Sequence, residues 1–550
     1  MRGTLGEFDQ MTTSPLLAVE DLKTWFSPGN DPIRAVEGVS FTIKRGETFV
    51  LLGESGCGKS ITALTIMRLL PHAARVVSGS VRLNGEDLLR LPEKAMRAVR
   101  GARIAMIFQE PQTSLNPVLS VGTQIGEVLT QHQRLTGRAR RQRVVELLHA
   151  VRIPEPERRL EEYPHQFSGG MKQRVMIAMA LAGDPDLLIA DEPTTALDVT
   201  IQAQVLELLQ ELQRTSGMAI LFITHDLGVA FQMADRIAVM YRGSIVELAA
   251  RETFFKSPQH AYSRRLFDAL PNKAKRIREA GSPTAKEEGK LLEVNDLKVH
   301  FPIRKGVLRR VVGHVQAVDG VSMEIAKGQT LAMVGESGSG KTTVGKGILQ
   351  LIRPTSGTVR FHGEELTTLS ARQLRKRRSQ IQIVFQDPYS SMNPRMMVGD
   401  IIEEGMVAQQ IGKNREERRH KVRELLQQVG LEPAYARRYP HEFSGGQRQR
   451  ICIARALAVG PQLIVCDEPT SALDVSVQSQ ILELLRDLQR RLGLAYLFIT
   501  HNLGVVEYIA HKVAVMYQGR IVEQGEVDEV LSRPRHPYTQ RLLAAVPKIG

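Results

Sequence analysis

The chain has 550 residues, of which 42% are hydrophobic and 24% charged, with a formal net charge of +14 at pH 7. This composition is ordinary for a globular protein, and no run approaches the roughly 18–20 consecutive apolar residues that a membrane-spanning helix needs. The three cysteines are too few and too scattered for a disulfide framework, a cysteine-based zinc site or an iron–sulfur cluster, and the positive charge favours polyanionic partners without choosing among them.

A β-rich region follows a polar tail at residues 1–15. Residues 16–43 alternate short apolar runs with turn residues, a pattern typical of strands. Residues 292–325 repeat the pattern and add a basic insert between Arg304 and Arg310. We interpret this insert either as a solvated hairpin or as a contact with lipid headgroups or with a loop of a partner protein.

Two glycine-rich loops come next, each after a short apolar run and before a helical stretch. Both fit the pattern G-x-x-x-x-G-K-[ST], whose backbone N–H groups wrap the phosphates of a nucleotide. The first loop consists of Gly53, Glu54, Ser55, Gly56, Cys57, Gly58, Lys59 and Ser60, and the second of Gly335, Glu336, Ser337, Gly338, Ser339, Gly340, Lys341 and Thr342. The chain is therefore expected to contain two nucleotide sites.

The residue types of these loops match phosphate and metal chemistry. Glycines let consecutive amides turn inward at backbone angles that a side chain would obstruct. Lys59 and Lys341 are expected to reach the β- and γ-phosphates of ATP, and the hydroxyls of Ser60 and Thr342 to ligate Mg²⁺. Cys57 is interpreted as a tolerated small residue or, alternatively, as a point of redox inhibition.

Helical periodicity dominates residues 110–165 and 387–440, which are rich in Arg, Glu, Gln and Leu. Each stretch lies between two predicted strands and is expected to form an inserted helical subdomain. A short apolar strand then ends at an acidic pair in each half. Buried parallel strands look this way, and their carboxyl ends form the ligand-binding edge of α/β sheets.

The two acidic pairs fit the chemistry of ATP hydrolysis. Asp191 and Asp467 are candidates to hold Mg²⁺ through its water shell. Glu192 and Glu468 follow directly and are candidates to polarise the attacking water. The alternative is that each pair only caps the Pro-Thr turn that comes after it.

Both halves close with a similar His- and Tyr-containing segment. Tyr262 and Leu266, like Tyr538 and Leu542, are spaced four residues apart and share one face of a predicted closing helix, which we interpret as structural packing. Residues 271–290 are polar, interrupted by Gly and Pro, and free of apolar periodicity, so they are predicted to be a linker.

The motifs of the two halves recur at a near-constant offset. Lys59 and Lys341 lie 282 positions apart, and the acidic pairs lie 276 positions apart. Such an offset over half the chain indicates a duplicated domain rather than a short-period solenoid. We therefore predict two domains, at residues 16–270 and 291–550, on either side of the linker.

Further motifs recur in the same order in both halves. They are Ser168-Gly169-Gly170 and Ser444-Gly445-Gly446, Gln109 and Gln386, residues 196–198 and 472–474 (Ala-Leu-Asp), and His225 and His501. Together with the phosphate loops, this set resembles the ATP-binding cassette (ABC) family over residues 16–550. The resemblance implies the α/β class: two tandem P-loop NTPase cassettes, each a RecA-like core with a β-rich subdomain and an inserted helical subdomain.

The resemblance also implies roles for single residues. Phe26 and Phe301 would stack on adenine, with Trp25 and His300 as less well placed neighbours. The glutamines Gln109 and Gln386 would sense Mg²⁺ and the attacking water, and the histidines His225 and His501 would hold the γ-phosphate. No catalytic group is missing from either half, so two competent sites are expected.

In the ABC family two cassettes pack head to tail, so that each ATP lies between the phosphate loop of one cassette and the Ser-Gly-Gly turn of the other. A Ser-Gly-Gly turn that opens a helix presents free N–H groups to an anion. Carried over to this chain, the resemblance pairs Lys59 with Ser444 and Lys341 with Ser168. The expected dimer is therefore an intramolecular one between the two cassettes.

A narrower resemblance comes from the residues around the glutamines and from the chain's His-Pro-Tyr-Thr ending. Residues 108–111 with 114–117, and residues 385–388 with 391–394, look like the ATPases of oligopeptide and dipeptide importers, here as a fused pair. This implies a peripheral ATPase at the cytoplasmic face of the bacterial inner membrane. Its partners would be two transmembrane permease subunits, fed by an extracytoplasmic peptide-binding protein.

Several alternatives stay open at this point. The cargo of the importer could instead be glutathione-like, a peptide antibiotic or a nickel complex. A soluble tandem cassette that acts on the ribosome would carry a long charged helical linker, which the short Pro-broken linker here does not match, and an exporter ATPase is a closer rival. No zinc finger, recognition helix or aromatic platform organises the basic runs, so no nucleic-acid partner is expected.

Overall fold

In a computed structural model of the chain, the described residues are 14–26, 32–195, 197–270, 289–305, 310–471 and 473–546. They form two compact units, the first built mainly from residues up to Asp268 and the second mainly from Ala269–Val546. Most of the predicted tail and linker lies outside the described residues, as do Ala196, Ala472 and residues 306–309 of the basic insert. Among the described residues, no helix has the length and apolarity that crossing a bilayer requires.

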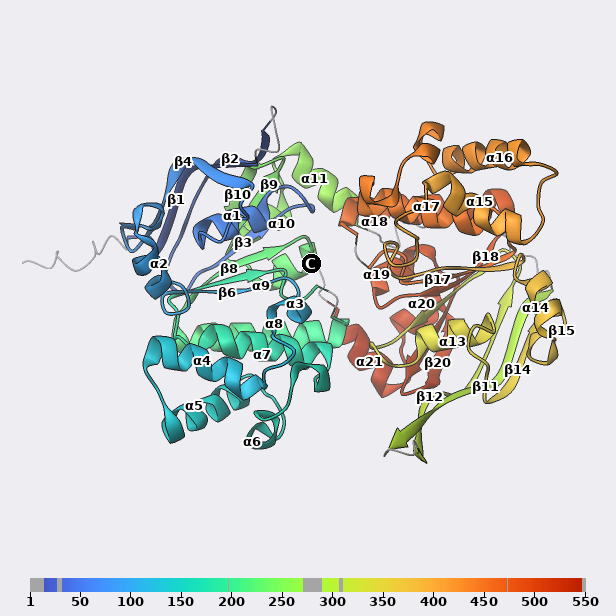
Figure 1. Cartoon of the computed structure of the whole chain (residues 1–550), viewed down its shortest axis with the longest axis horizontal. Helices are drawn as coiled ribbons and strands as arrows, with labels where there is room; N and C mark the ends of the chain where they lie inside the picture. The colour runs from blue at the N-terminus through green and yellow to red at the C-terminus, as the bar shows by residue number, and fades with distance from the viewer. Residues whose placement is uncertain are drawn as a thin grey trace, which may run out of the picture. The chain divides into compact units, whose positions relative to one another are not determined.

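The first unit is organised around a six-stranded sheet in the order β10-β9-β3-β8-β7-β6 (Figure 1). Five of these strands run parallel, and the edge strand β10 is antiparallel to β9. The strands are β3 (Thr48–Leu52), β6 (Ile104–Ile107), β7 (Leu187–Asp191), β8 (Ala219–Thr224), β9 (Arg236–Tyr241) and β10 (Ser244–Ala250). Every residue of β3, β7 and β8 is buried, because helices or a second sheet cover both faces of the strands.

A smaller antiparallel sheet in the order β2-β1-β4-β5 accounts for the β-rich start of this unit. Its strands are β1 (Leu17–Phe26), β2 (Ile33–Ile43), β4 (Ala74–Leu83) and β5 (Glu86–Asp87). The helices are α1 (Lys59–Ile66), α2 (Glu93–Val99), α3 (Pro111–Ser114), α4 (Val121–Gln133), α5 (Gly137–Ala150), α6 (Pro156–Arg159), α7 (Gly169–Leu181), α8 (Val199–Ser216), α9 (Leu227–Met233), α10 (Arg251–Lys256) and α11 (Ala261–Asp268). Helices α3 to α7 lie between β6 and β7 in the chain, which confirms the predicted helical insertion.

The second unit repeats both sheets, in the orders β16-β17-β18-β13-β19-β20 and β12-β11-β14-β15. Its strands are β11 (Lys290–Lys305), β12 (Arg310–Ala326), β13 (Thr330–Val334), β14 (Ser356–Phe361), β15 (Glu364–Glu365), β16 (Ile381–Val384), β17 (Leu463–Asp467), β18 (Ala495–Ile499), β19 (Lys512–Tyr517) and β20 (Arg520–Glu526). Its helices are α13 (Lys341–Ile348), α14 (Ala371–Arg377), α15 (Val398–Ala408), α16 (Arg415–Gln428), α17 (Gly445–Leu457), α18 (Val475–Leu492), α19 (Leu503–Ile509), α20 (Val527–Ser532) and α21 (Pro537–Ala544). The predicted α/β class and the duplication are therefore confirmed.

Strands β11 and β12 form a long antiparallel hairpin on either side of the basic insert. Arg304 pairs with Val311 and Lys305 with Arg310, so the described ends of the insert belong to this ladder. Whether it also contacts lipid or a partner protein stays a prediction.

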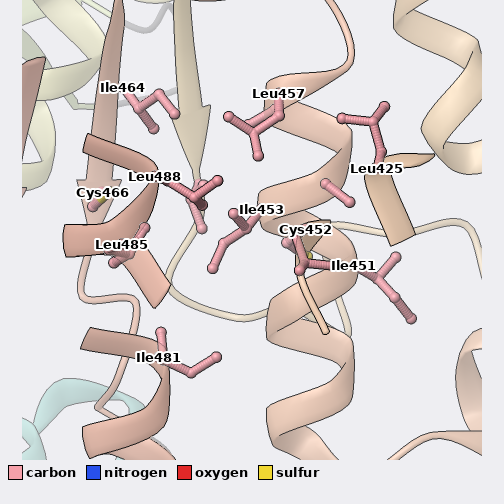
Figure 2. Close-up of a cluster of buried hydrophobic side chains, with 14 of the residues drawn as sticks. Leu425, Ile451, Cys452, Ile453, Leu457, Ile464, Cys466, Ile481, Leu485 and Leu488 are labelled. Atoms are coloured by element: carbon pink, nitrogen blue, oxygen red, sulfur yellow. The ribbon is translucent and has the colours of Figure 1, made fainter. Parts of the chain in front are cut away.

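In the second unit, helix α17 is held by a cluster of buried apolar side chains. Figure 2 shows Ile451, Ile453 and Leu457 of α17 among side chains of the neighbouring helices and strand. These neighbours are Leu425 of α16, Ile464 and Cys466 of β17, and Ile481, Leu485 and Leu488 of α18. Because α17 begins directly after Ser444, this packing also fixes the position of the Ser-Gly-Gly turn.

We expect Ile453→Ala to lower the free energy of unfolding of the second unit by about 2–5 kcal/mol, because Ile453 is fully buried and its truncation leaves a cavity. Hydrogen exchange of α17 and α18 peptides, read by mass spectrometry, measures this loss directly. The exposed Arg419→Ala on α16 is the matched control and should change the same value by no more than about 0.5 kcal/mol. Equal exchange in the two variants would contradict the packing role of Ile453.

Candidate functional site

Both glycine-rich loops connect the end of a central parallel strand to the start of a helix. The first loop links β3 to α1, and the second links β13 to α13. Gly58 and Gly340 adopt φ angles of 108° and 102°, and a Cβ at either position would lie 2.3 Å or 2.1 Å from a backbone oxygen. Only glycine therefore fits at this position of the two loops.

The loop lysines fold back onto their own loops. The Lys59 ammonium donates to the carbonyl oxygens of Gly53 and Glu54 at 2.7 and 2.9 Å. Lys341 donates to those of Gly335 and Glu336, both at 2.8 Å. Both lysines are buried, so each loop encloses a positive charge that suits the phosphates of a nucleotide.

The hydroxyl at the end of each loop meets the first acid of the pair. Ser60 donates to Asp191 Oδ1 at 3.0 Å, and Thr342 donates to Asp467 Oδ1 at 2.9 Å. Burial raises the pKa of Asp191 to about 6, although the Ser60 hydroxyl and Lys59 favour its ionised form. Burial raises the pKa of Asp467 as well.

This pair of hard oxygen ligands fits Mg²⁺, which is usually held by one or two protein groups together with waters and substrate phosphates. A buried carboxylate with a raised pKa gains most from a nearby cation, because the cation offsets the cost of ionising it away from water. The alternative in which the acidic pair only caps the following turn does not account for the contacts with Ser60 and Thr342.

In the first unit, three side chains from separate segments meet at the Glu192 carboxylate. Gln109 donates its side-chain amide to Oε2 at 3.0 Å, and His225 Nδ1 lies 3.1 Å from Oε1. The Lys59 ammonium is 4.0 Å from the same carboxylate. Burial alone would raise the pKa of Glu192, but His225 and Lys59 outweigh it and lower the pKa to about 2.

The second unit repeats the arrangement around Glu468. Gln386 donates to Oε2 at 3.0 Å, and His501 Nδ1 lies 3.3 Å from Oε1. Burial opposes ionisation here too, yet His501 and Lys341 lower the pKa of Glu468. The structure thus brings the glutamine, the acid and the histidine of each half together, while the roles that the resemblance implies for them stay predictions.

Both glutamates carry an unusual backbone conformation. Glu192 and Glu468 each have φ at 46°, in the left-handed region that non-glycine residues rarely occupy. Backbone hydrogen bonds hold them there: the Glu192 N–H donates to Ile223 O at 3.0 Å, and the Glu468 N–H donates to Ile499 O at 2.9 Å. Such strain gathers where a side chain must be aimed, which supports a functional role for both acids.

One contact differs between the two clusters. The Thr195 hydroxyl donates to the Glu192 carboxylate at 2.9 Å, whereas the Ser471 hydroxyl donates to the backbone oxygen of Glu468 at 3.1 Å. This difference in contact could not be predicted from the sequence.

The Ser-Gly-Gly turns lie at the starts of α7 and α17. The Ser168 and Ser444 hydroxyls accept the N–H of Met171 and of Gln447, so each serine caps its own helix. In the part of the chain that the structure describes, these serines are not brought into the glutamate cluster of their own unit. Gly169, Gly170, Gly445 and Gly446 form the first turns of these helices.

The two predicted adenine-stacking residues belong to the antiparallel sheets. Phe26 ends β1, and the ring of Phe301 on β11 is 40% exposed, which leaves it accessible to a planar ligand. The neighbouring Trp25 is engaged elsewhere, since its indole donates to Glu37 at 2.8 Å. Cys57 is buried within the first loop.

Two contacts to the loops were missed by sequence reasoning. The Tyr262 hydroxyl accepts the backbone N–H of Glu54 at 3.4 Å, and the Tyr538 hydroxyl accepts that of Glu336 at 2.9 Å. The repeated tyrosine of the closing segments was the available signal, but we interpreted it as packing alone.

Two protein-family models match this chain. The family model described as "ABC transporter" matches residues 36–195 and 318–471. The model described as "Oligopeptide/dipeptide transporter, C-terminal region" matches residues 246–295 and 522–550, so it too matches twice.

Among curated relatives, the "Peptidoglycan transport ATP-binding protein YejF" of Agrobacterium fabrum is 51% identical over 98% of this chain and 97% of its own length. The "Glutathione import ATP-binding protein GsiA" of Pectobacterium atrosepticum is 48% identical over 97% of this chain and 89% of its own. The protein of the same name from Escherichia coli K12 is 48% identical over 98% of this chain and 90% of its own.

The raised pKa of Asp191 predicts a pH-dependent cost in stability. A carboxyl whose pKa rises from 3.8 in the unfolded chain to about 6 in the folded one contributes stability at low pH and loses it as pH rises through this window. Asp191→Asn should therefore be more stable than the wild type at neutral pH, by up to about 3 kcal/mol, and the gap should close toward about pH 4.

Circular dichroism melts of both proteins between about pH 4 and pH 7.5 measure this gap as a difference in melting temperature. The exposed Asp268→Asn is the control, and its curve should run parallel to that of the wild type. A gap between Asp191→Asn and the wild type that stays constant over this range would contradict the assignment.

Proposed function

The chain belongs to the family of ABC transporter ATPases, and on this premise we propose that it is the ATPase subunit of an importer for short peptides. The observation that carries the proposal is that both units hold the same acid, glutamine and histidine cluster beside a phosphate loop. The near full-length match to import ATP-binding proteins supports the transport role. The two matches to the oligopeptide/dipeptide C-terminal region favour peptides as cargo.

Each phosphate loop would bind the phosphates of one ATP. Lys59 and Lys341 would exchange their loop carbonyl partners for the β- and γ-phosphates, and Phe26 and Phe301 would stack on adenine. Ser60 with Asp191, and Thr342 with Asp467, would hold Mg²⁺, with Gln109 and Gln386 as the further ligands expected from the sequence. When bound, Mg²⁺ would neutralise charge on the phosphates.

Glu192 and Glu468 would orient and polarise the attacking water. Their lowered pKa keeps both carboxylates ionised at neutral pH, so they can accept a hydrogen bond from that water. His225 and His501 lie against these carboxylates and would turn toward the γ-phosphate when ATP is bound. The strained backbone at each glutamate supports this aiming role.

Each site would be completed by the other unit. The N–H groups at the starts of α7 and α17 suit an anion, yet each serine there caps its own helix and each unit already has its own phosphate loop. We therefore propose an intramolecular dimer of cassettes in which Lys59 works with Ser444, and Lys341 with Ser168.

The partners would be two membrane permeases and, through them, an extracytoplasmic peptide-binding protein. The protein would be peripheral, at the cytoplasmic face of a bacterial inner membrane. A specific second candidate for the cargo is a glutathione-like peptide, because relatives named as glutathione importers match almost as well as the relative named for peptidoglycan transport. Both candidates are short peptide derivatives, so one transport mechanism serves either.

Replacing the catalytic acids tests whether both sites hydrolyse ATP. We expect Glu192→Gln and Glu468→Gln each to lower kcat clearly, and the double variant to lower it by about 10²–10⁴-fold, because a carboxamide orients but cannot polarise the water. Phosphate release with the purified protein measures these rates. The exposed Glu404→Gln is the control and should retain wild-type activity.

Unequal effects of the two single substitutions on ATPase activity would contradict the proposal of two competent sites. If Glu192→Gln leaves ATPase activity unchanged while Glu468→Gln abolishes it, the first site is degenerate and the proposal of two competent sites is wrong.

Uptake of a labelled compound into vesicles tests which cargo the importer carries. Vesicles that contain the protein with its permeases and binding protein should accumulate a labelled tripeptide when ATP is supplied on the side of the ATPase. Excess unlabelled glutathione should compete if the cargo is glutathione-like, and should have no effect if the site selects ordinary peptides. Failure to accumulate the labelled tripeptide, and labelled glutathione in a parallel assay, while ATPase activity persists, would contradict the importer role.

A further inference from the structure

The closing helix of each unit reaches the phosphate loop of the same unit. Tyr262 and Leu266 on α11 are buried, as are Tyr538 and Leu542 on α21, which confirms the predicted packing face. The hydroxyls of the two tyrosines also make hydrogen bonds, which packing alone does not require. They accept the backbone N–H of the second loop residue, Glu54 or Glu336, at 3.4 and 2.9 Å.

The tyrosine rings are fixed beside the central sheet. Tyr262 stacks on Tyr241 with ring centroids 4.2 Å apart, and Tyr538 stacks on Tyr517 at 4.3 Å. Tyr241 ends β9, which pairs in parallel with β3, the strand that leads into the first loop. The same holds for β19 and β13 in the second unit. The stack therefore places each hydroxyl next to the loop's first residues.

Hydrogen bonds at the start of each closing helix fix its position. The Glu247 carboxylate on β10 accepts the N–H groups of Gln259 and His260 at 2.8 and 2.9 Å. The His260 ring then accepts the N–H of Tyr262 at 3.1 Å. These hydrogen bonds, from Glu247 through His260, hold the main chain of Tyr262, and the contact with Tyr241 holds its ring.

The second unit contains the same arrangement on different residues. The Glu523 carboxylate on β20 accepts the N–H groups of Arg535 and His536 at 2.8 and 3.1 Å, and the His536 ring accepts that of Tyr538 at 3.1 Å. Burial opposes the ionisation of Glu247 and Glu523, but the hydroxyl of Ser263 or Thr539 and then these N–H groups lower the pKa of the two carboxyls, so both stay charged.

The loop residue that each tyrosine contacts is held from two sides. The N–H of Glu54 donates to Tyr262, while its carbonyl accepts the Lys59 ammonium at 2.9 Å. In the second unit the Glu336 N–H donates to Tyr538, and its carbonyl accepts the Lys341 ammonium at 2.8 Å. A shift of this peptide unit would therefore move the carbonyl that positions the lysine.

We propose that Tyr262 and Tyr538 are positioning residues of the nucleotide sites, and that each closing helix is a support of the phosphate loop in its own unit. This inference rests on the proposed binding of nucleotide phosphates by these loops. It gives the closing part of each half, which falls within the two matches to the oligopeptide/dipeptide C-terminal region, a direct part in nucleotide binding.

A hydroxyl acceptor suits this position for a chemical reason. Burial raises the pKa of Tyr538 to about 12, so the hydroxyl stays neutral and places no negative charge beside a loop that must bind phosphates. Burial also raises the pKa of Tyr262. Phenylalanine would keep the ring and its packing while losing the hydroxyl, which is both an acceptor and an O–H donor.

The test compares two double variants with the same chemical change. Tyr262→Phe/Tyr538→Phe removes both loop contacts, and Tyr241→Phe/Tyr517→Phe removes a hydroxyl from the other ring of each stack. We expect the first pair to weaken binding of a fluorescent ATP analogue about three- to tenfold, the range for one lost hydrogen bond, and to raise the KM for ATP by the same factor. Its kcat should stay within about twofold of the wild-type value, because the acids are untouched.

The control pair should bind the analogue within about 1.5-fold of wild type, and the melting temperatures of both pairs should agree. Equal affinities in the two pairs would overturn the inference, as would a loss of affinity that follows an equal loss of melting temperature. A third double variant, Lys59→Ala/Lys341→Ala, distinguishes a failure of the tyrosine inference from a failure of the proposed nucleotide binding. If that variant binds the analogue as tightly as wild type, the loops do not bind phosphates at all.

Discussion

The parallel alignment of five strands in each unit is the constraint on which both candidate sites depend. In the first unit the phosphate loop follows β3, Gln109 follows β6, the acidic pair lies at the end of β7 and His225 follows β8, and these four strands are consecutive in the sheet. Side chains separated by more than a hundred residues therefore meet at one edge without any long-range loop. Buried apolar strands hold that edge in register, so the fold itself sets the distances around Glu192.

The two adjacent acids at this edge have pKa values that are shifted in opposite directions by their surroundings. Burial raises the pKa of Asp191 to about 6 against the effect of the Ser60 hydroxyl, whereas His225 and Lys59 outweigh burial at Glu192 and lower its pKa to about 2. Two neighbouring carboxyls with different pKa values can take different chemical roles. In the proposed function, Asp191 would gain from a cation, and Glu192 would stay ionised to polarise a water.

The sequence predicted the residues of each cluster through the resemblance to the ABC family, whose motifs recur in the same order in both halves. The structure shows why these residues lie together, since they lie at the carboxyl ends of parallel strands, which share one edge of the sheet. The tyrosine contacts could not be predicted, since they depend on where a helix two hundred residues beyond the loop packs against the sheet. The left-handed backbone of Glu192 was also beyond prediction, because no glycine or asparagine signals it.

The duplication makes the remaining differences between the units informative. Gln, acid, histidine, lysine and tyrosine contacts recur in both, so selection on geometry explains them better than chance packing. Thr195 departs from this rule: it donates to the Glu192 carboxylate, while Ser471 donates to a backbone oxygen. An extra donor stabilises the ionised carboxylate and must be displaced or shared when a water binds. The two glutamates therefore share their glutamine and histidine neighbours, but the Glu192 carboxylate accepts a further side-chain hydrogen bond, from Thr195, where the matching serine donates to the backbone of Glu468.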